Sequence, residues 1–311
     1  MPPIQDHPLR FQLSNELHAR PFPTLTTASR AVFLALKHRH VAGVDAVQAD
    51  IDHLIMLLDR YGAAHPQPGA THYFGKLGKH RLKWERHTEF VTFTLLVDGL
   101  SDRAFDAADF ALFPEDWLAA APGLRITSCL LRIEPQHDAG IIREKLSKWF
   151  VRESLAASSV LDSSGVIAGD FHIDEAGHSR FALFIADGVG QGRIGRILQR
   201  LFEIETYKAN SMLGLAKSRE LSKRMGPLDF ELTQLMGQMQ TNGDDAVGQL
   251  DELLRISAEL EALQAKTSFR FGATGAYEAI VNQRIQALRE VPWEGRQTLA
   301  EFMMRRFDPA M

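Results

Sequence analysis

Apolar and polar residues alternate along the first 190 residues in patterns that predict both strands and helices. Runs rich in β-branched and aromatic residues indicate strands, at residues 30–40, 71–77, from 81 onward, 89–97, 125–134, 160–173 and 180–186. Helical patterns lie at residues 44–61, 114–121 and 139–150. Several hairpins combined with crossover helices predict an α+β fold, with a mixed, mostly antiparallel sheet and flanking helices.

The strand pattern ends at Gly188, and apolar residues at helical spacing take its place. These residues recur every three or four positions, namely Ile194, Ile197, Leu198, Leu201 and Ile204, then Leu228, Leu232, Leu235, Met236 and Met239, then Val247, Leu250, Leu254 and Leu263. Pro227 and Asn242-Gly243 are the predicted breaks between helices. We therefore expect an α+β domain at residues 1–190 and a long-helix C-terminal domain at residues 191–311.

Charges are segregated along the predicted helices. Residues 193–224 hold eight Lys and Arg against three Glu, whereas residues 229–261 hold one Arg against eight Asp and Glu. Opposite charges on consecutive helices favour contact, so we expect the two segments to pack as antiparallel neighbours across Gly226-Pro227. Two separately solvated helices are the alternative.

Composition narrows the class of protein. Hydrophobic residues make up 45% of the 311 residues and the formal net charge is −4, so no basic field indicates nucleic acid as a partner. The lone cysteine, Cys129, excludes a disulfide framework and is expected to be a core residue. The N-terminus has no secretory signal pattern, and no apolar run approaches the roughly 20 residues of a membrane-spanning helix. The abrupt end at residues 305–311 looks like a cut in a longer protein.

Two groups of residues are candidate metal ligands. His38 and His40 lie two apart on a predicted strand, so both side chains leave the same face, although a third ligand is needed. Carboxylates offer oxygen ligands of the kind that Mg²⁺ or another divalent cation prefers, at Asp244, Asp245, Asp251 and Glu252. The alternatives are hydrogen-bonded or solvent-facing histidines, and acidic residues that complement a helix dipole.

Two polar segments are candidate binding sites in the α+β region. An acid/base or anion-binding cluster would comprise His7, Glu16, His18 and Arg20. The same side chains can instead cap a helix and pair with one another. Residues 81–89 alternate charged and apolar groups, which indicates either an anion-binding face or a ladder of ion pairs between strands.

A glycine-rich segment at residues 188–196 joins the last predicted strand to the first long helix. Backbone N–H groups in such a turn can cradle phosphate, here with Gly190, Gly192, Arg193 and Arg196. The Lys-Ser/Thr of a P-loop and a following βαβ unit are both missing, so we favour a joint over a nucleotide site. No known catalytic motif is found, and no catalytic residue is assigned.

Five long motifs, spread over nearly the whole chain, carry a family resemblance. They are HPLRFQLSNELHARPF at 7–22, RLKWERHTEF at 81–90, GRIGRILQRLFEIETYK at 192–208, FRFGATGAYEAIVNQRI at 269–285 and RRFDPAM at 305–311. Together they resemble a bacterial family of uncharacterised, predicted membrane-anchored proteins. The resemblance implies two hydrophobic membrane segments beyond the equivalent of Met311, and no established activity. The plan is also similar in architecture to the cytosolic part of CorA-type divalent-cation channels.

Two functions follow as hypotheses. The first is a non-enzymatic domain at the cytoplasmic face of the bacterial inner membrane, which self-associates and senses or gates divalent-cation transport. The second is an enzyme or a nucleotide- or anion-binding protein that uses the 188–196 segment or the polar cluster of residues 7–20. The first hypothesis predicts a homo-oligomer biased by Mg²⁺ or a similar cation.

Overall fold

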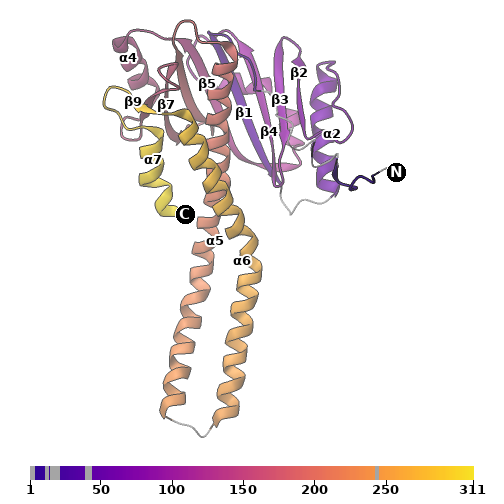
Figure 1. Ribbon diagram of the computed structural model, residues 1–311, viewed down its shortest axis with the longest axis vertical. Helices are drawn as coiled ribbons and strands as arrows, with labels where there is room; N and C mark the ends of the chain where they lie inside the picture. Colours follow the sequence, from indigo (N-terminus) through magenta and orange to yellow (C-terminus); the bar gives the residue numbers. More distant parts are fainter. Residues whose placement is uncertain (1–3, 11–13, 15–21, 39–43, 242–244) are drawn as a thin grey trace.

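The computed structural model describes residues 4–10, 14, 22–38, 44–241 and 245–311. These residues form one sheet with helices on both faces, and a pair of long helices extends away from it (Figure 1). The sheet is mixed and mostly antiparallel, and the C-terminal part is helical. The predicted α+β class is therefore confirmed.

Nine strands in the described residues are hydrogen-bonded in the order β2-β3-β4-β1-β5-β8-β7-β6-β9. Their bounds are β1 (Ser29–His38), β2 (His72–Leu77), β3 (His80–Arg86), β4 (Phe90–Asp98), β5 (Gly123–Pro135), β6 (Ala156–Val160), β7 (Gly165–Ile173), β8 (Ser179–Ile185) and β9 (Val291–Pro292). Only β5 and β8 pair in parallel among these strands. Their connection contains one helix and the β6–β7 hairpin, because parallel neighbours need a long crossover.

The helices divide between short covers of the sheet and two long rods. Their bounds are α2 (Val44–Arg60), η1 (Ala107–Leu112), α3 (Glu115–Ala119), α4 (Ala139–Trp149), α5 (Gln191–Thr241), α6 (Ala246–Leu288), α7 (Leu299–Arg306) and η3 (Asp308–Ala310). We call α5 and α6 together the hairpin, and the rest of the molecule the head.

Both faces of the central strand β1 are buried. Ala31, Phe33 and Ala35 face a core shared with α5, α6 and α7. The alternating residues Val32 and Leu34 face a second core with α2 and α3, and α4 covers a third core over β6, β7 and β8. A strand buried on both faces reads as a continuous apolar run, which is the pattern of its sequence.

The hairpin is anchored on the sheet at one end. With 51 residues, α5 is about 75 Å long, and only its first part lies against the sheet (Figure 1). The two helices approach closely at Gly214, where an added Cβ would lie 2.3 Å from Thr274 Oγ1. Nearer the tip, Leu228 and Leu235 of α5 pack against Ile256 of α6.

The predicted break at Pro227 is wrong, because α5 continues through this residue. Proline removes one helix hydrogen bond to the carbonyl four residues earlier. Pro227 and Lys223 are exposed, so water can solvate the carbonyl of Lys223. The basic segment 193–224 meets the acidic segment through the ion pair of Arg224 with Glu259, near the point where the two segments join. The acidic segment otherwise folds back on itself, with an ion pair from Arg255 to Glu231, so the two segments are not the antiparallel neighbours that we expected. The acidic segment is the tip of the hairpin and not a separate helix.

The predicted strand at residues 160–173 is also incorrect at its start. It combines the end of β6 with a turn and β7, and Leu161, Asp162 and Ser163 of that turn all have positive φ. β9 is an addition that the sequence pattern does not predict, and it pairs with β6. The boundary at residue 190 falls between β8 and α5, and the division into two domains stays a prediction.

None of the described helices combines the length and the apolar character that crossing a bilayer requires.

Candidate functional site

A cleft of about 520 Å³ lies at the end of the sheet where β1 and β3 finish and β4 begins. Both the head and the hairpin contribute residues to its walls. The head contributes His38, Asp50 and Arg86, and the hairpin contributes Tyr207 and Tyr277. This volume is typical of sites for small molecules.

A histidine and an aspartate form a buried pair in this cleft. His38 Nε2 lies 2.8 Å from Asp50 Oδ2, and the side chain of Asp50 has no solvent exposure. The second atoms of both groups, His38 Nδ1 and Asp50 Oδ1, are also buried and have no hydrogen-bond partner among the described residues. Arg86 Nη1 is likewise buried and has no hydrogen-bond partner among the described residues. Buried polar atoms without partners are costly, and three side chains that line this cleft each carry one, which makes the cleft a candidate site for a polar ligand.

The chemistry of these three atoms defines what the cleft can bind. An ionised carboxylate only accepts, so the hydrogen of the His38–Asp50 bond belongs to Nε2. Nδ1 accepts when the ring is neutral and donates when it is protonated, Asp50 Oδ1 is an acceptor, and Arg86 Nη1 is a donor. With a neutral His38 the site therefore offers two acceptors and one donor.

Aromatic rings form one wall of the cleft. The ring of His87 stacks on Phe90 with their centroids 4.4 Å apart. Tyr207 and Tyr277 meet Phe90 at steeper angles, with centroid separations of 5.8 Å and 6.3 Å. The faces of tyrosine and phenylalanine attract cations, so this wall favours a positively charged group.

Beside the cleft, Glu89 ties the hairpin to the sheet. Its carboxylate accepts hydrogen bonds from Arg270 and from the Tyr277 hydroxyl at 2.7 Å, and Lys37 Nζ lies 3.1 Å away. Burial alone would raise the pKa of Glu89, but these partners lower it to about 2. Burial and the bond to Glu89 raise the pKa of Tyr277. Glu89 is therefore ionised at neutral pH and links β4 to α6.

A second polar link joins β3 to α5. Lys83 Nζ lies 2.9 Å from Glu85 and 2.7 Å from Gln199 Oε1, and Gln199 in turn donates to Glu203. A small cavity of about 30 Å³ lies between these groups. Arg81 lies 3.6 Å from Asp98 on the neighbouring strand. The alternating charges at 81–89 thus include ion pairs within and between strands, as well as bonds to the hairpin.

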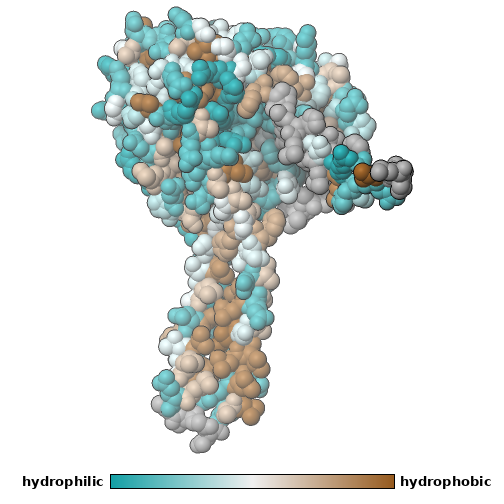
Figure 2. Space-filling view, in the orientation of Figure 1, coloured by the Kyte–Doolittle hydropathy of each residue, from teal (hydrophilic) through white to brown (hydrophobic). Residues whose placement is uncertain are grey.

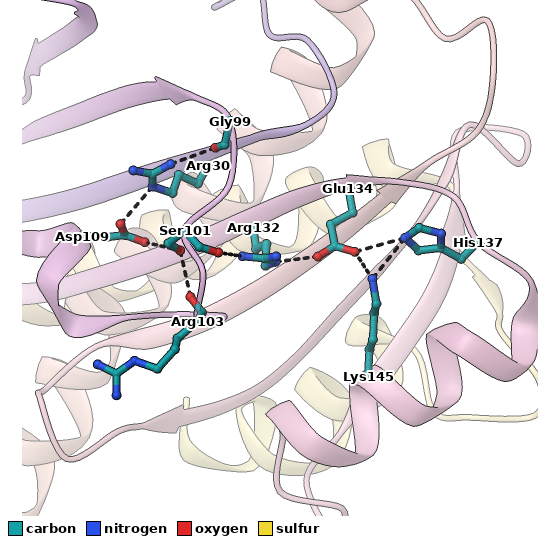
Figure 3. A network of polar contacts seen from close by, with 9 residues as sticks. All are labelled: Arg30, Gly99, Ser101, Arg103, Asp109, Arg132, Glu134, His137 and Lys145. Atoms are coloured by element: carbon teal, nitrogen blue, oxygen red, sulfur yellow. Dashed lines mark hydrogen bonds and ion pairs between the residues drawn. The ribbon is translucent and has the colours of Figure 1, made fainter.

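A third polar network lies on the opposite face of the sheet from the hairpin (Figure 3). It lies between the core that packs against α2 and α3 and the core that α4 covers. Glu134 is its centre and accepts from Arg132 at 2.5 Å and from Lys145, and its carboxylate lies 3.2 Å from His137 Nε2. Burial would raise the pKa of Glu134, but the bonds from Lys145 and Arg132 lower it. The charged partners are all supplied within the network, so its role is to hold α4 against β5.

Glu134→Gln is expected to lower the free energy of unfolding by about 2 kcal/mol, because Arg132 and Lys145 would lose their anionic partner while half-buried. Denaturant unfolding measures the change. Glu144→Gln is the matched control on α4, because Glu144 pairs with Lys148 on the surface and is expected to contribute little to stability. Equal effects of the two substitutions would contradict a special role for the network.

Of the predicted histidine pair, the structure describes one member. His38 has Asp50 as its partner, and His40 lies outside the described residues. Among the predicted polar cluster, His7 is exposed and its Nδ1 accepts from the backbone N–H of Leu9. Glu16, His18 and Arg20 lie outside the described residues.

The predicted acidic ligands are spread along the start of α6. Asp245 caps this helix through the backbone N–H of Gly248, and Glu252 pairs with Arg255 at 2.7 Å. Asp251 is exposed, and Asp244 lies outside the described residues. Nowhere in the described ranges do three or more His, Cys, Asp or Glu side chains gather as a metal ion would need.

The glycine-rich segment forms the first turn of α5. The Gly190 carbonyl accepts from the N–H groups of Arg193 and Ile194, and Gly190 and Gly192 have open space around them. Arg193 lies 3.6 Å from Asp162, and Arg196 is exposed. A role in anion binding stays a prediction for these residues.

Comparison with known proteins places the chain in a family. No curated protein and no solved structure matches it. A model of a protein family of unknown function, DUF3422, matches residues 5–311. Because this match covers nearly the whole chain, the protein belongs to the DUF3422 family of proteins of unknown function.

Proposed function

We propose that this protein is a non-enzymatic sensing domain whose ligand is a small organic amine that also carries a carbonyl or an anionic group. One observation carries the proposal: three side chains that line one cleft, those of His38, Asp50 and Arg86, each carry a buried polar atom without a partner among the described residues. The aromatic wall and the volume of the cleft agree with a ligand of this size.

The proposed ligand satisfies each of these atoms. An ammonium or amide group donates to Asp50 Oδ1 and His38 Nδ1, and a carboxylate or carbonyl oxygen accepts from Arg86 Nη1. The rings of Phe90, Tyr207 and Tyr277 line the same cleft, and aromatic rings favour a nearby cation. A free amino acid is the simplest molecule with this arrangement.

Ligand binding would be coupled to the hairpin. Tyr207 lies on α5 and Tyr277 on α6, whereas the polar atoms come from the head. A ligand that contacts both bodies binds best when the hairpin is seated on the sheet, so it shifts the population toward that state. This coupling is the sensing step of the proposal.

Isothermal calorimetry with a panel of free amino acids tests the binding step, with an amine lacking a carboxylate and a carboxylate lacking an amine as comparison probes. We expect Asp50→Asn to weaken amino acid binding at least about tenfold, because the amine loses its anionic partner. Asp52→Asn is the matched control, since Asp52 lies on the same helix but is exposed. Absence of binding by every amine, or equal effects of the two substitutions, would overturn the proposal.

The divalent-cation and membrane-anchored forms of this function rest on the family resemblance and the similarity to CorA-type channels. A Mg²⁺ titration in the same calorimeter addresses the cation, and co-sedimentation of the full-length protein with bacterial inner membranes addresses the anchor. Heat on adding Mg²⁺ that disappears in Asp50→Asn would make the cleft a cation site in place of an amine site.

The His38–Asp50 pair also favours a second candidate, an enzyme that uses general base catalysis. A carboxylate on one ring nitrogen and an unpaired second nitrogen are the arrangement that orients a histidine base. NMR of the bound amino acid over time distinguishes the two functions. Chemical conversion that His38→Gln abolishes would establish the enzyme, and an unchanged ligand supports the sensor.

A further inference from the structure

We propose that two copies of this chain associate through the distal parts of their hairpins, side by side and in opposite directions. The inference is independent of the cleft and of its ligand. It rests on the surface of α5 and α6 beyond the sheet, where apolar side chains and unpaired charges are both exposed.

The apolar part of this surface is extensive. Figure 2 shows apolar surface along the distal hairpin, which projects away from the head. Large apolar residues with at least two-fifths of their surface exposed there are Met225, Phe230, Met236, Met239, Val247, Leu250, Leu254 and Phe269. Val247, Leu250 and Leu254 follow the three- and four-residue spacing of one helix face. Such a stripe on a projecting helix pair indicates an interface.

Unpaired charges on the same surface select the partner. On the segments nearer the head, Arg219, Lys223 and Lys266 have no ion-pair partner among the described residues. The same holds nearer the tip, within the described part of the chain, for Asp229, Asp251 and Glu261. From the head toward the tip of one hairpin, three cations without an ion-pair partner among the described residues are thus followed by three such anions.

A second copy in the opposite direction complements this order. It places the acidic tip of each hairpin beside the basic segment of the other, and a two-fold axis makes both contacts identical. A parallel arrangement would instead set like charges against each other. The exposed apolar side chains of each hairpin then bury against the partner hairpin in a four-helix arrangement.

Sedimentation velocity of the protein over a range of concentrations tests the association. We expect Leu250→Gln with Leu254→Gln to raise the dimer Kd at least about tenfold, without change in the helical circular dichroism. Leu124→Gln with Ile173→Gln is the matched control, because those residues are equally exposed on the head. A wild-type monomer at every concentration, or a dimer that the hairpin substitutions leave intact, would overturn the proposal. Binding of the wild type to phospholipid vesicles in place of self-association would overturn it as well.

Exchanging acidic and basic residues tests whether the two hairpins run in opposite directions. Asp251→Lys with Glu261→Lys is expected to weaken the dimer, and adding Arg219→Glu with Lys223→Glu in the same chain is expected to restore it. Spin labels then report orientation, because Cys129 is buried and an introduced cysteine is the labelled one. Labels at Gly226→Cys should lie close together across the axis, and labels at Gln240→Cys far apart. Close labels at the tip would show a parallel pair and contradict the inference.

Discussion

Gly195→Ala is expected to destabilise the protein by about 3 kcal/mol, although alanine is normally the better helix former. Gly195 lies in the first turns of α5, where a Cβ would be 1.5 Å from the backbone oxygen of Pro23 and 2.6 Å from its carbonyl carbon. The neighbouring atoms are backbone on both sides, so no flexible side chain can move away. The start of α5 must therefore shift from the sheet, and its apolar residues lose part of their contacts.

Differential scanning calorimetry checks this effect, with a fall in Tm of about 5 °C expected. Gly192→Ala is the matched control in the same helix, because no atom lies within 4 Å of its added Cβ. There we expect no loss, and even a gain of a few tenths of a kcal/mol from lower chain entropy in the unfolded state. A neutral Gly195→Ala would show that Pro23 does not hold this position.

The sequence predicted most elements because their burial follows simple periodicity. β1 and β4 are buried on both faces, and α2 presents one apolar face. β6 was not separated from β7, because Ala156-Ala-Ser-Ser lacks the β-branched and aromatic residues that mark a strand. Its conformation is fixed by tertiary contacts with β7 and β9.

Pro227 shows the limit of local rules in the opposite direction. Proline usually ends a helix, but at this position the helix continues, and Leu228 and Leu235 on its far side contact α6. The tertiary contact outweighs the lost hydrogen bond. Segregated charge did not determine where the chain turns, because the acidic segment continues α5 past Pro227 and folds back on itself at the tip.

The cleft was only partly predictable. His38 was a candidate from its position on a strand, and Asp50 gives a signal that was not used: a charged residue in the buried stripe between Val47 and Leu54. Arg86 and Tyr277 could not be joined to them, since spacing along the chain carries no information about contacts between segments so far apart. Only the path of the hairpin across the sheet brings these residues together.

Glu89→Gln is expected to lower the free energy of unfolding by about 3 kcal/mol at neutral pH. The substitution leaves Arg270 and Lys37 without their anion, although both side chains are more than four-fifths buried. Because Arg270 and Tyr277 belong to α6, the loss falls on the contact between hairpin and head. Hydrogen exchange should accelerate in α6 around these residues and less in the strands of the sheet. Glu278→Gln on the same helix is the control, because Glu278 has no ion-pair partner in the described part of the chain.

The pH dependence of this effect identifies its cause. Since the pKa of Glu89 is lowered from 4.5 to about 2 in the folded protein, its contribution is complete above the unfolded value and is lost as the pH falls through that window. Protonated glutamic acid and glutamine have similar shape and no charge. The difference in stability between wild type and Glu89→Gln should therefore shrink as unfolding is measured at progressively lower pH, while other titrating groups cancel in the comparison. A difference that stays constant down to about pH 2.5 would show that the shape of the side chain, and not its charge, holds the hairpin on the sheet.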